Sequence, residues 1–412
     1  MTNDANTYDR NAAEQGGAGL HARSFGAVGD GISDDTQALQ KAMDSLRHGD
    51  ALHISGGIYN CDNIAIPSGV TIKGYGGSAS DMANPFPDFY SYGSQIRLRN
   101  LSSISMAPGS AIEGVTVVRD GLPISATMAL YKQARSDASL ISAAQAAGIE
   151  MTKNFRGVAI YANQPCVTVK DCLILGNEQA VRLTSEKTSN LIGGRCLISN
   201  VRGDNTNGIF MENCADVCRI KDCHMWPFLT GTCPGPTDAQ NTDGNFLNRH
   251  GVAYYIGHRN DWTQLSGCFS YGYRKGFHLH GCANITLNDC KADGNGFEYK
   301  SSGFHINDLA FQAAELISLC NCCSFSNDHG VYIESGGTSK QNVVKVIGGT
   351  WVANTGIHVV KGRCIAIGNH FLLGHGIYFR ETATGGIVEG NIFTESEHYV
   401  HPNARVVFAN CQ

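Results

Sequence analysis

The sequence is poor in charge. Only 16% of its 412 residues are Asp, Glu, Lys or Arg, and the formal net charge is −5. No run of basic residues stands out, so the charge pattern gives no reason to expect nucleic acid as a partner. Hydrophobic runs are also short. No apolar stretch approaches the roughly 20 residues that a membrane-spanning helix needs, and we therefore expect no membrane partner.

The N-terminus, MTNDANTYDRNAAEQGGAGL, has neither the basic start nor the apolar stretch of a signal peptide. The sequence therefore predicts a product that stays in the cytoplasm where it is made, or that leaves the cell on a larger particle. Residues 1–22 fit no repeat and are predicted to form a flexible arm.

Glycine is abundant, with 49 residues, and it recurs at the start of a repeated segment in the second half of the chain. A Gly or its stand-in precedes a short alternating apolar strand nine times, mostly at intervals of 20 to 28 residues. The nine segments are GVAIY at 157, AVRLT at 180, GIFME at 208, GVAYY at 251, GFHLH at 276, GFHIN at 303, GVYIE at 330, GIHVV at 356 and GIYFR at 376. A repeat of this period whose unit is a strand indicates a solenoid.

Strand alternation assigns the two faces of each repeated strand. When the repeats are aligned on the glycine, the first and third residues after it are almost all apolar and are predicted to point inward. The second and fourth residues are mixed and are predicted to point outward. The first outward column is Ala159, Arg182, Phe210, Ala253, His278, His305, Tyr332, His358 and Tyr378. The second is Tyr161, Thr184, Glu212, Tyr255, His280, Asn307, Glu334, Val360 and Arg380.

The 16 cysteines make the chain cysteine-rich, and a second strand in many repeats ends in Asp-Cys or Gly-Cys. Six of them fall at matching places: Cys172, Cys196, Cys223, Cys268, Cys290 and Cys322. Because stacked coils lie about 4.8 Å apart, we expect a ladder of reduced, buried thiols, although neighbouring rungs are near disulfide range. The ladder explains these cysteines without zinc. His278 and His280 share a strand face but lack a third ligand, so no metal or other cofactor is expected.

The stretch FGAVGDG at 25–31, followed by DDTQALQKAMD at 34–44, is either a site for a metal or phosphate or the entry to a fold. Asp34 or Asp35 can cap a helix predicted at about 34–47, whose apolar stripe would cover the open end of a solenoid. The stretch resembles the entry segment of the pectate-lyase-like superfamily of right-handed parallel β-helices, which includes phage tailspikes, polysaccharide lyases and plant-type pectinases. The resemblance covers residues 23 to about 75.

The predicted fold is therefore all-β: a single-stranded right-handed parallel β-helix over residues 23–412 with an N-terminal capping α-helix. Two segments interrupt the repeat. Ala-rich helical spacing at about 123–147 predicts a helical insertion, and a Pro-, Gly- and Thr-rich stretch at about 227–248 predicts a long loop.

The outward columns become rich in aromatic, imidazole, amide and charged groups from His278 onward. Sugar rings stack on aromatic faces, and sugar hydroxyls need mixed donors and acceptors. The candidate polysaccharide-binding residues are His278, His280, Asn307, Tyr332, His358, Tyr378 and Arg380. The same stripe could instead be buried in a homotrimer interface or be ordinary surface.

Two chemistries fit the candidate catalytic residues. Hydrolysis needs two carboxylates flanking the bond. Asp308 and Glu334, on adjacent coils, are the candidate pair, with Glu298, Asp293 and Asp328 in reserve. Elimination beside a uronate needs a base and a cation; the residues that could supply them are His305, His280, Arg274, Lys275 and Arg380. The sequence does not separate these chemistries.

The resemblance and the polar N-terminus together favour a phage virion spike, expected to be a homotrimer with a glycan-facing groove. In that case residues 1–22 would contact other virion proteins. Whether it also degrades the polysaccharide stays open at this point. Two alternatives stay open. One is a non-catalytic virion rod in a tail, collar or neck, and the other is an intracellular bacterial enzyme that degrades exopolysaccharide.

Overall fold

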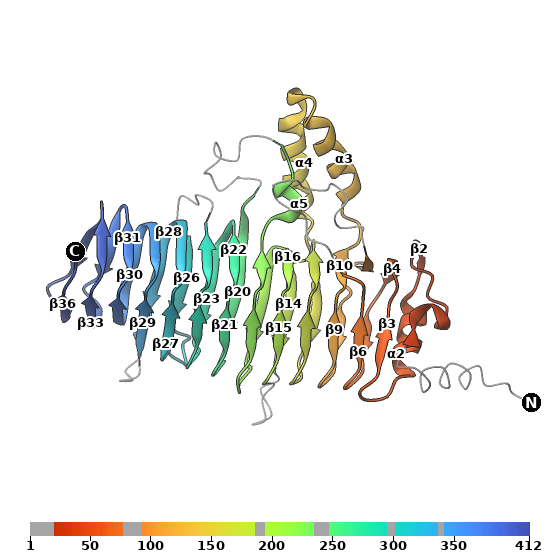
Figure 1. Cartoon of the computed structure of the whole chain (residues 1–412), viewed down its shortest axis with the longest axis horizontal. Coiled ribbons are helices and arrows are strands. Elements are labelled where there is room, and N and C mark those ends of the chain that lie inside the picture. The colour runs from red at the N-terminus through yellow and green to blue at the C-terminus, as the bar shows by residue number, and fades with distance from the viewer. Residues whose placement is uncertain (1–19, 77–92, 186–193, 235–246, 295–300, 337–341) are drawn as a thin grey trace, which may run out of the picture.

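The computed structural model describes residues 20–76, 93–185, 194–234, 247–294, 301–336 and 342–412. The chain winds as a parallel β-helix, in which successive coils add parallel strands to three stacks, A, B and C, along one axis (Figure 1). The predicted parallel β-helix is confirmed. The first strand begins at Leu20, before the predicted boundary at residue 23.

The strands of the three stacks follow one another along the axis from the N-terminal end. Stack A holds β1 (Leu20–His21), β3 (Ala51–His53), β6 (Thr71–Lys73), β9 (Ala111–Glu113), β12 (Thr168–Lys170), β15 (Leu197–Ser199), β18 (Arg219–Lys221), β21 (Gln264–Ser266), β24 (Thr286–Asn288), β27 (Ile317–Cys320), β29 (Val343–Ile347), the end of β30 (Thr350–Ile367), β33 (Ala383–Glu389) and β36 (Val406–Ala409). Stack B holds β2 (Asp30–Asp34), β4 (Gly57–Cys61), β7 (Ser94–Leu98), β10 (Thr116–Arg119), β13 (Leu173–Leu175), β16 (Arg202–Asp204), β19 (His224–Met225), β22 (Phe269–Tyr271), β25 (Lys291–Asp293), the starts of β28 (Cys323–Glu334) and β30, β31 (His370–Leu372) and β34 (Ile392–Thr394). Stack C holds β5 (Ile64–Ile66), β8 (Ile104–Met106), β11 (Val158–Ala162), β14 (Gln179–Thr184), β17 (Asn207–Glu212), β20 (Arg249–Gly257), β23 (Tyr273–His280), β26 (Ser302–Asn307), the end of β28, the middle of β30, β32 (His375–Phe379) and β35 (Glu397–Val400).

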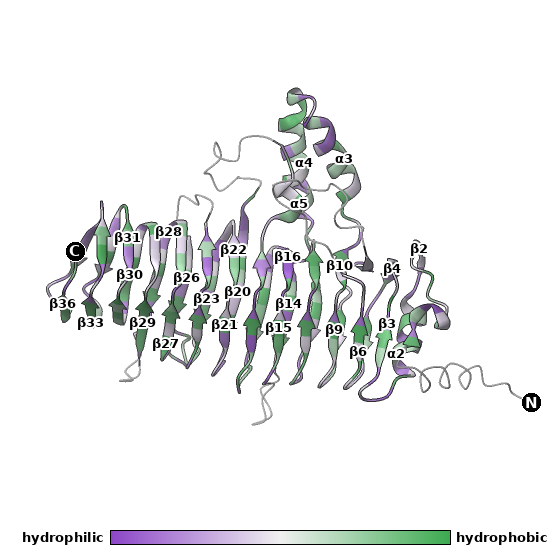
Figure 2. Ribbon diagram, viewed as in Figure 1, coloured by the Kyte–Doolittle hydropathy of each residue, from purple (hydrophilic) through white to green (hydrophobic). Residues whose placement is uncertain are grey.

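One continuous apolar core runs inside the coils from Ala22 to Ala404. Figure 2 shows apolar residues spread along the whole length of the β-helix rather than gathered at one end. No helix within the described ranges is long and apolar enough to cross a membrane.

A residue in the left-handed region makes the corner between stacks A and B on many coils. Asp171, Asp222, Asp289 and Asn321 have φ of 52–54°, and Gly267 takes the same place with φ of 62°. Asp, Asn and Gly adopt this region at lower cost than other residues. The next residue then turns into the core, which explains the recurring Asp-Cys and Gly-Cys pairs.

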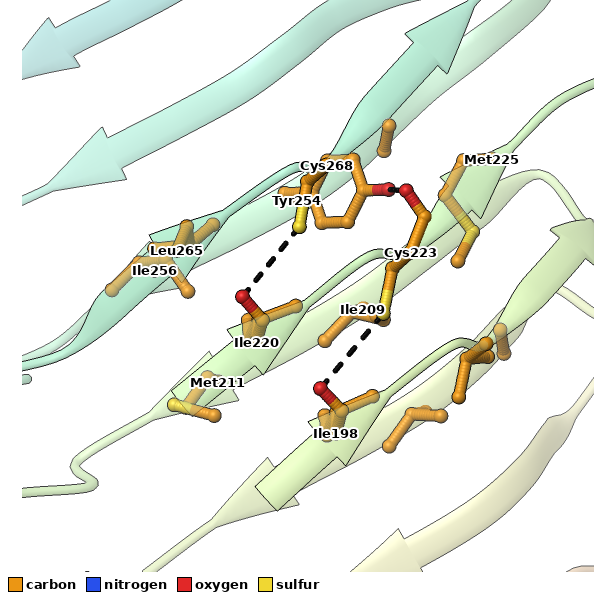
Figure 3. Packing of buried hydrophobic residues seen from close by; sticks show 14 of the residues in the cluster. Ile198, Ile209, Met211, Ile220, Cys223, Met225, Tyr254, Ile256, Leu265 and Cys268 are labelled. Carbon is orange, nitrogen blue, oxygen red and sulfur yellow. Dashed lines mark hydrogen bonds between the residues drawn. The ribbon is translucent and has the colours of Figure 1, made fainter. Parts of the chain in front are cut away.

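These corner cysteines form the predicted thiol ladder, and all 16 cysteines are free. Cys223 Sγ donates to the carbonyl of Ile198 at 3.9 Å and Cys268 Sγ to that of Ile220 at 3.6 Å, in each case on the preceding coil (Figure 3). Burial raises the pKa of the Cys223 and Cys290 thiols well above the usual value. The ladder consists of Cys223, Cys268, Cys290 and Cys322 on successive coils. Cys172 occupies the same corner two coils before Cys223, and Val201 lies between them.

Cys196 was wrongly included in this ladder. Leu197 pairs with Arg219 in stack A, so Cys196 is level with Cys218 at a different corner. Both corners place a small apolar side chain inward, and the sequence alone does not distinguish them.

The N-terminal capping helix is α2 (Thr36–Asp44), shorter than the predicted span of about 34–47. Leu39, Ala42 and Met43 on one side of it are buried in the core. The helix lies at the N-terminal end of the β-helix (Figure 1).

The acidic residues before this helix make hydrogen bonds that stabilise the fold. Asp35 is 1% exposed, and its carboxylate accepts hydrogen bonds from the backbone N–H groups of Val28 (2.6 Å) and Gly29 (3.2 Å). Asp34 accepts from Thr36 N at the start of the helix. These bonds join the glycine loop to the helix and favour the structural interpretation of the motif.

The helical insertion comprises α3 (Ile124–Ala134), the 3-10 turn η3 (Ala138–Leu140) and α4 (Ile141–Lys153), so it extends beyond the predicted end at about 147. Figure 1 shows it projecting from the β-helix beside α5 (Phe228–Gly231), the short helix that opens the predicted long loop. Residues 235–246 of that loop and residues 1–19 of the predicted arm lie outside the described residues. A second apolar cluster joins the insertion to stack B; its members include Met128, Met151, Leu173, Leu175 and Trp226.

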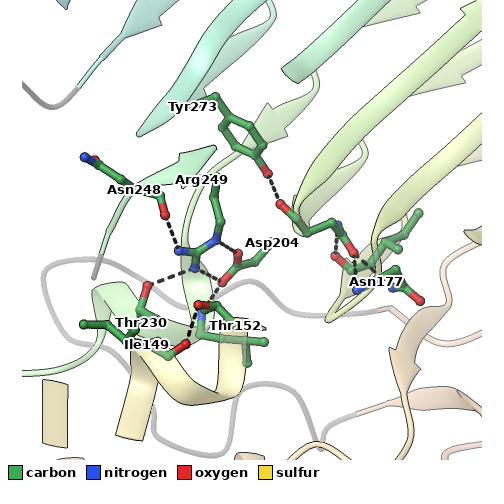
Figure 4. A network of polar contacts seen from close by, with 11 residues as sticks. Ile149, Thr152, Asn177, Asp204, Thr230, Asn248, Arg249 and Tyr273 are labelled. Carbon is green, nitrogen blue, oxygen red and sulfur yellow. Dashed lines mark hydrogen bonds and ion pairs between the residues drawn. The ribbon is translucent and has the colours of Figure 1, made fainter. Parts of the chain in front are cut away.

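A buried ion pair ties α5 to this region (Figure 4). Arg249 and Asp204 are 3% and 0% exposed at their side chains, with Nε–Oδ1 at 2.8 Å and Nη2–Oδ2 at 3.0 Å. Arg249 also donates to Thr230 Oγ1, and Asp204 accepts from the N–H of Leu229. Hydrogen bonds within the protein thus replace most of those that the pair would have made with water, which is what makes a buried charge stable.

Replacing Arg249 with Met should leave the Asp204 carboxylate buried without a counter-charge. We expect the free energy of unfolding in urea to fall by about 3–5 kcal/mol, and the double variant Asp204→Asn/Arg249→Met to recover much of the loss. Lys153→Met, which removes the exposed pair with Glu150, is the control and should change stability by less than about 1 kcal/mol. An Arg249→Met protein as stable as the wild type would refute this role.

Candidate functional site

The strand pairing in stack C corrects the predicted outward columns at three coils. On β30, Lys361 rather than the predicted Val360 pairs with Glu334 and belongs to the second column. Tyr255, which was predicted for the second column with Ala253 in the first, pairs with Phe210 on one side and His278 on the other. Tyr255 therefore belongs to the first column. The same two-residue shift occurs at β11, where Tyr161 rather than Ala159 is in register with Arg182 of the first column.

With this register the first outward column is an unbroken row of rings on eight successive coils, the ring ladder. Its members are Phe210, Tyr255, His278, His305, Tyr332, His358, Tyr378 and Tyr399. Adjacent ring centroids are 4.6–5.4 Å apart, with stacked and edge-on contacts interspersed. Stacked and edge-on contacts at these distances are the arrangements that aromatic pairs prefer.

Polar columns border the ring ladder on both sides. One column holds Lys275, Ser302, His329, Thr355 and His375, and the other holds His280, Asn307, Glu334 and Lys361. The columns are bonded to the rings: His278 Nε2 lies 2.8 Å from Asn307 Oδ1, and Tyr255 OH lies 3.0 Å from His280 Nδ1. The result is a surface of ordered donors and acceptors around aromatic faces.

Burial keeps the imidazoles of the ladder uncharged. It lowers the pKa of His305 to about 2, of His278 to about 3 and of His358 to about 4, and neighbouring cationic groups add to the effect. Burial, with the nearby Arg274, also lowers the pKa of Lys275 to about 8, and Glu334 acts in the opposite direction.

Two hollows lie over the C-terminal half of the ladder. One has a volume of about 370 Å³ and is lined in part by Ser302, His305, Asp328, His329 and Glu334. The other has a volume of about 460 Å³ and is lined in part by Val360, Tyr378, Glu381, Tyr399 and His401. Tyr332, His358 and Arg380 line both hollows. The two therefore form one groove along the ladder.

Some of the predicted binding residues line the groove, and the others lie on the coils N-terminal to it. Tyr332, His358, Tyr378 and Arg380 line the groove, whereas His278, His280 and Asn307 lie on the preceding coils. Sequence reasoning missed Ser302, His329 and Tyr399. Ser302 and His329 each immediately precede the glycine of a repeat, so the position before the glycine was the signal that could have found them.

Of the predicted catalytic carboxylates, Asp308 accepts three hydrogen bonds within the protein. Its Oδ1 accepts from Ala314 N at 2.8 Å and Ser335 Oγ at 2.6 Å, and its Oδ2 accepts from Gly336 N at 2.7 Å. These bonds join two turns and favour a structural role for Asp308. Glu334 has no hydrogen bond or ion pair with any described residue and lines the first hollow.

The other two predicted catalytic residues differ in position. His305 lines the first hollow, with Nδ1 3.3 Å from Ser302 Oγ. Glu298 lies outside the described residues. Within the described ranges, no three His, Cys, Asp or Glu side chains are grouped so that they could hold a metal ion.

Residues 20–96 match the family model described as rhamnogalacturonase A/epimerase, pectate lyase-like. A segment of 52 residues is 44% identical to the capsule K30/K69-specific depolymerase of Klebsiella phage K64-1. That segment is 13% of this chain and 7% of the phage protein, so the match covers only a small part of either.

The fold as a whole is similar to solved structures of proteins that bind or act on saccharides, although the sequence identity is low. Two of them are a phage tailspike and an α-1,3-glucanase. The tailspike of E. coli bacteriophage HK620, in complex with a pentasaccharide, superposes with a TM-score of 0.57 at 12% identity, covering 94% of this chain and 67% of that one. The catalytic unit of the GH87 α-1,3-glucanase from Streptomyces thermodiastaticus superposes with a TM-score of 0.56 at 12% identity, covering 97% and 69%. The N-terminal segment thus carries a pectate-lyase-like signature, and the whole described chain has the fold of these proteins.

The buried imidazoles should make the protein sensitive to mild acid. In the unfolded chain a histidine has a pKa near 6.5, above the folded values for His278, His305 and His358. The unfolded chain therefore binds more protons below pH 6.5, so the contribution of these histidines to stability is full above that pH and is lost toward pH 4. We expect the Tm to fall between pH 6.5 and 5. The fall should be shallower in His305→Gln and unchanged in His48→Gln, an exposed control. Equal slopes in all three proteins would contradict the account.

Asp308 and Glu334 should differ in their effect on stability. Asp308→Ala removes three hydrogen bonds to a charged group and should lower the free energy of unfolding by about 2–4 kcal/mol. Glu334→Ala removes no such bond and should change it by about 0.5 kcal/mol or less. If chemical denaturation finds Asp308→Ala as stable as the wild type, the carboxylate is free for chemistry and the Asp308–Glu334 pair becomes the better candidate.

Proposed function

We propose that this chain is the polysaccharide-degrading β-helix of a phage virion spike. The observation that carries the proposal is the groove over the C-terminal half of the ring ladder, between two columns of polar side chains. Flat rings bind the apolar faces of sugars, and the neighbouring imidazole, amide and hydroxyl groups suit sugar hydroxyls. Five rungs at about 4.8 Å give roughly 20 Å of surface, which suits a short oligosaccharide.

The comparisons support the same class. A phage capsule depolymerase shares the 52-residue segment, and a phage tailspike bound to a pentasaccharide shares the fold. A virion location, a homotrimer and attachment through residues 1–22 are parts of the proposal that follow from this class.

For the chemistry, we propose elimination, with hydrolysis as the alternative. Hydrolysis needs two carboxylates about 5 to 9.5 Å apart. Two further carboxylates line the groove with Glu334: Asp328, six residues earlier on β28, and Glu381, next to Arg380. Asp328 is also bonded to His329 and Asn354.

Lys275 is the proposed base. It pairs in register with Ser302, which lines the first hollow, and it has no hydrogen-bond partner among the described residues. Its pKa of about 8 lies close to the operating pH that an efficient base requires. Lys275 would take the proton next to a sugar carboxylate; the bond to the leaving sugar would break, a carbon–carbon double bond would form, and water would protonate the leaving oxygen.

The test is a degradation assay on purified capsular polysaccharides, with the K30 and K69 capsules of Klebsiella among them. We expect new reducing ends together with unsaturated uronates. Lys275→Met should lower the rate at least about 100-fold, while Lys221→Met, an exposed control on stack A, should leave it unchanged.

Other outcomes would redirect the proposal. Reducing ends without unsaturation, lost in Glu334→Gln, would mean hydrolysis. No product from any polysaccharide, with binding retained, would contradict a degrading role and favour the non-catalytic virion rod.

A further inference from the structure

Arg380 is held in one orientation at the place where the two hollows meet. It follows β32 directly, and its guanidinium lies over the Tyr378 ring, 5.0 Å from the centroid. Its Nε donates to His358 Nε2 at 3.1 Å. These two contacts on different sides of the guanidinium fix the plane of the group.

The bond to His358 defines the tautomer of that histidine. Nε of Arg380 carries one hydrogen and can only donate, so Nε2 of His358 must be unprotonated and the ring proton must sit on Nδ1. His358 is 8% exposed and lies beside His329, with ring centroids 4.9 Å apart. A buried neutral imidazole thus acts as a fixed acceptor that positions the arginine.

The outer edge of Arg380 is left unused. Its Nη1 and Nη2 have no hydrogen-bond partner among the described residues, and no described carboxylate lies within 4 Å of the guanidinium. Asp328, Glu334 and Glu381 all line the same groove, yet none pairs with it. A planar fork with free N–H groups is the geometry that binds a carboxylate through two parallel hydrogen bonds.

We propose that Arg380 is the specificity-determining residue of the groove, binding the carboxylate of an acidic sugar through its Nη groups. His358 and Tyr378 are positioning residues for it. The substrate class is then a polysaccharide that carries carboxylates, such as uronates, rather than a neutral glycan. This inference rests on the proposed function, because it assigns a sugar type to the same groove.

The experiment compares one polysaccharide in two forms. The polymer is the one that the degradation assay identifies, or the one that binds if none is cut. It is tested in its native form and after chemical reduction of its carboxyl groups to alcohols. Affinities are measured by calorimetry on the full chain. We expect the wild type to bind the acidic form at least ten-fold more tightly than the reduced form.

The variants assign the effect to Arg380. Arg380→Gln should bind both forms with the weak affinity of the reduced polymer, and Arg380→Lys should keep only part of the preference. His358→Phe, which keeps a ring but loses the acceptor, should weaken binding of the acidic form alone. Arg219→Gln, an exposed arginine on stack A, is the matched control and should behave as the wild type.

Two results would overturn the inference and leave the polysaccharide-degrading role standing. One is a bound or degraded polymer with no carboxyl groups, which would also exclude the proposed elimination. The other is an Arg380→Gln protein that retains the preference for the acidic form, which would leave the elimination untouched. If the wild type binds no polysaccharide at all, the inference and the proposed function both fail.

Discussion

The parallel register of the coils is the constraint on which the rest of the structure depends. Because each residue of stack C lies directly above its counterpart on the next coil, a residue type that recurs in the sequence becomes a continuous row in space. Strand spacing of about 4.8 Å is close to the distance at which aromatic rings attract one another. The fold thus turns a loose sequence repeat into the ring ladder, and the same rule builds the thiol ladder inside.

Burial within this stack also sets the chemistry of the groove. The ladder imidazoles are packed between rings and near Lys275, so they stay neutral and act as hydrogen-bonding groups rather than charges. Charge is then left to a few exposed or half-buried side chains, chiefly Glu334, Arg380 and Lys275. The charges of Asp35, Arg249 and Asp204 have a different role, because these side chains are buried and are hydrogen-bonded within the fold.

The repeat made the fold predictable from the sequence, since the alternating faces, the capping helix and the Asp-Cys corners all follow from local patterns. The exact register did not follow. The pairing of β20 shifts between Arg249, which is anchored to Asp204, and Val252, so the glycine at 251 does not mark the same place as in other repeats. The shift hid Tyr255 from the ring ladder.

The groove could be predicted only in part from the sequence, because the side chains that line it come from different coils. Asp308 and Glu334 looked equivalent in the sequence, yet Asp308 is bonded to Ser335 and Gly336, 27 and 28 residues away. Likewise, the single bond between Arg380 and His358 joins neighbouring coils. Such roles depend on which side chains meet across the stack, and an outward position in the repeat does not reveal them.

The most direct test of the account is a crystal structure of the Glu334→Gln variant with an oligosaccharide of the polysaccharide that the protein binds. The account predicts sugar rings along the ring ladder between Ser302 and His401, parallel to the helix axis, with at least one ring against Tyr332 or Tyr378. Sugar bound on stack A or on the helical insertion, with the groove empty, would contradict it.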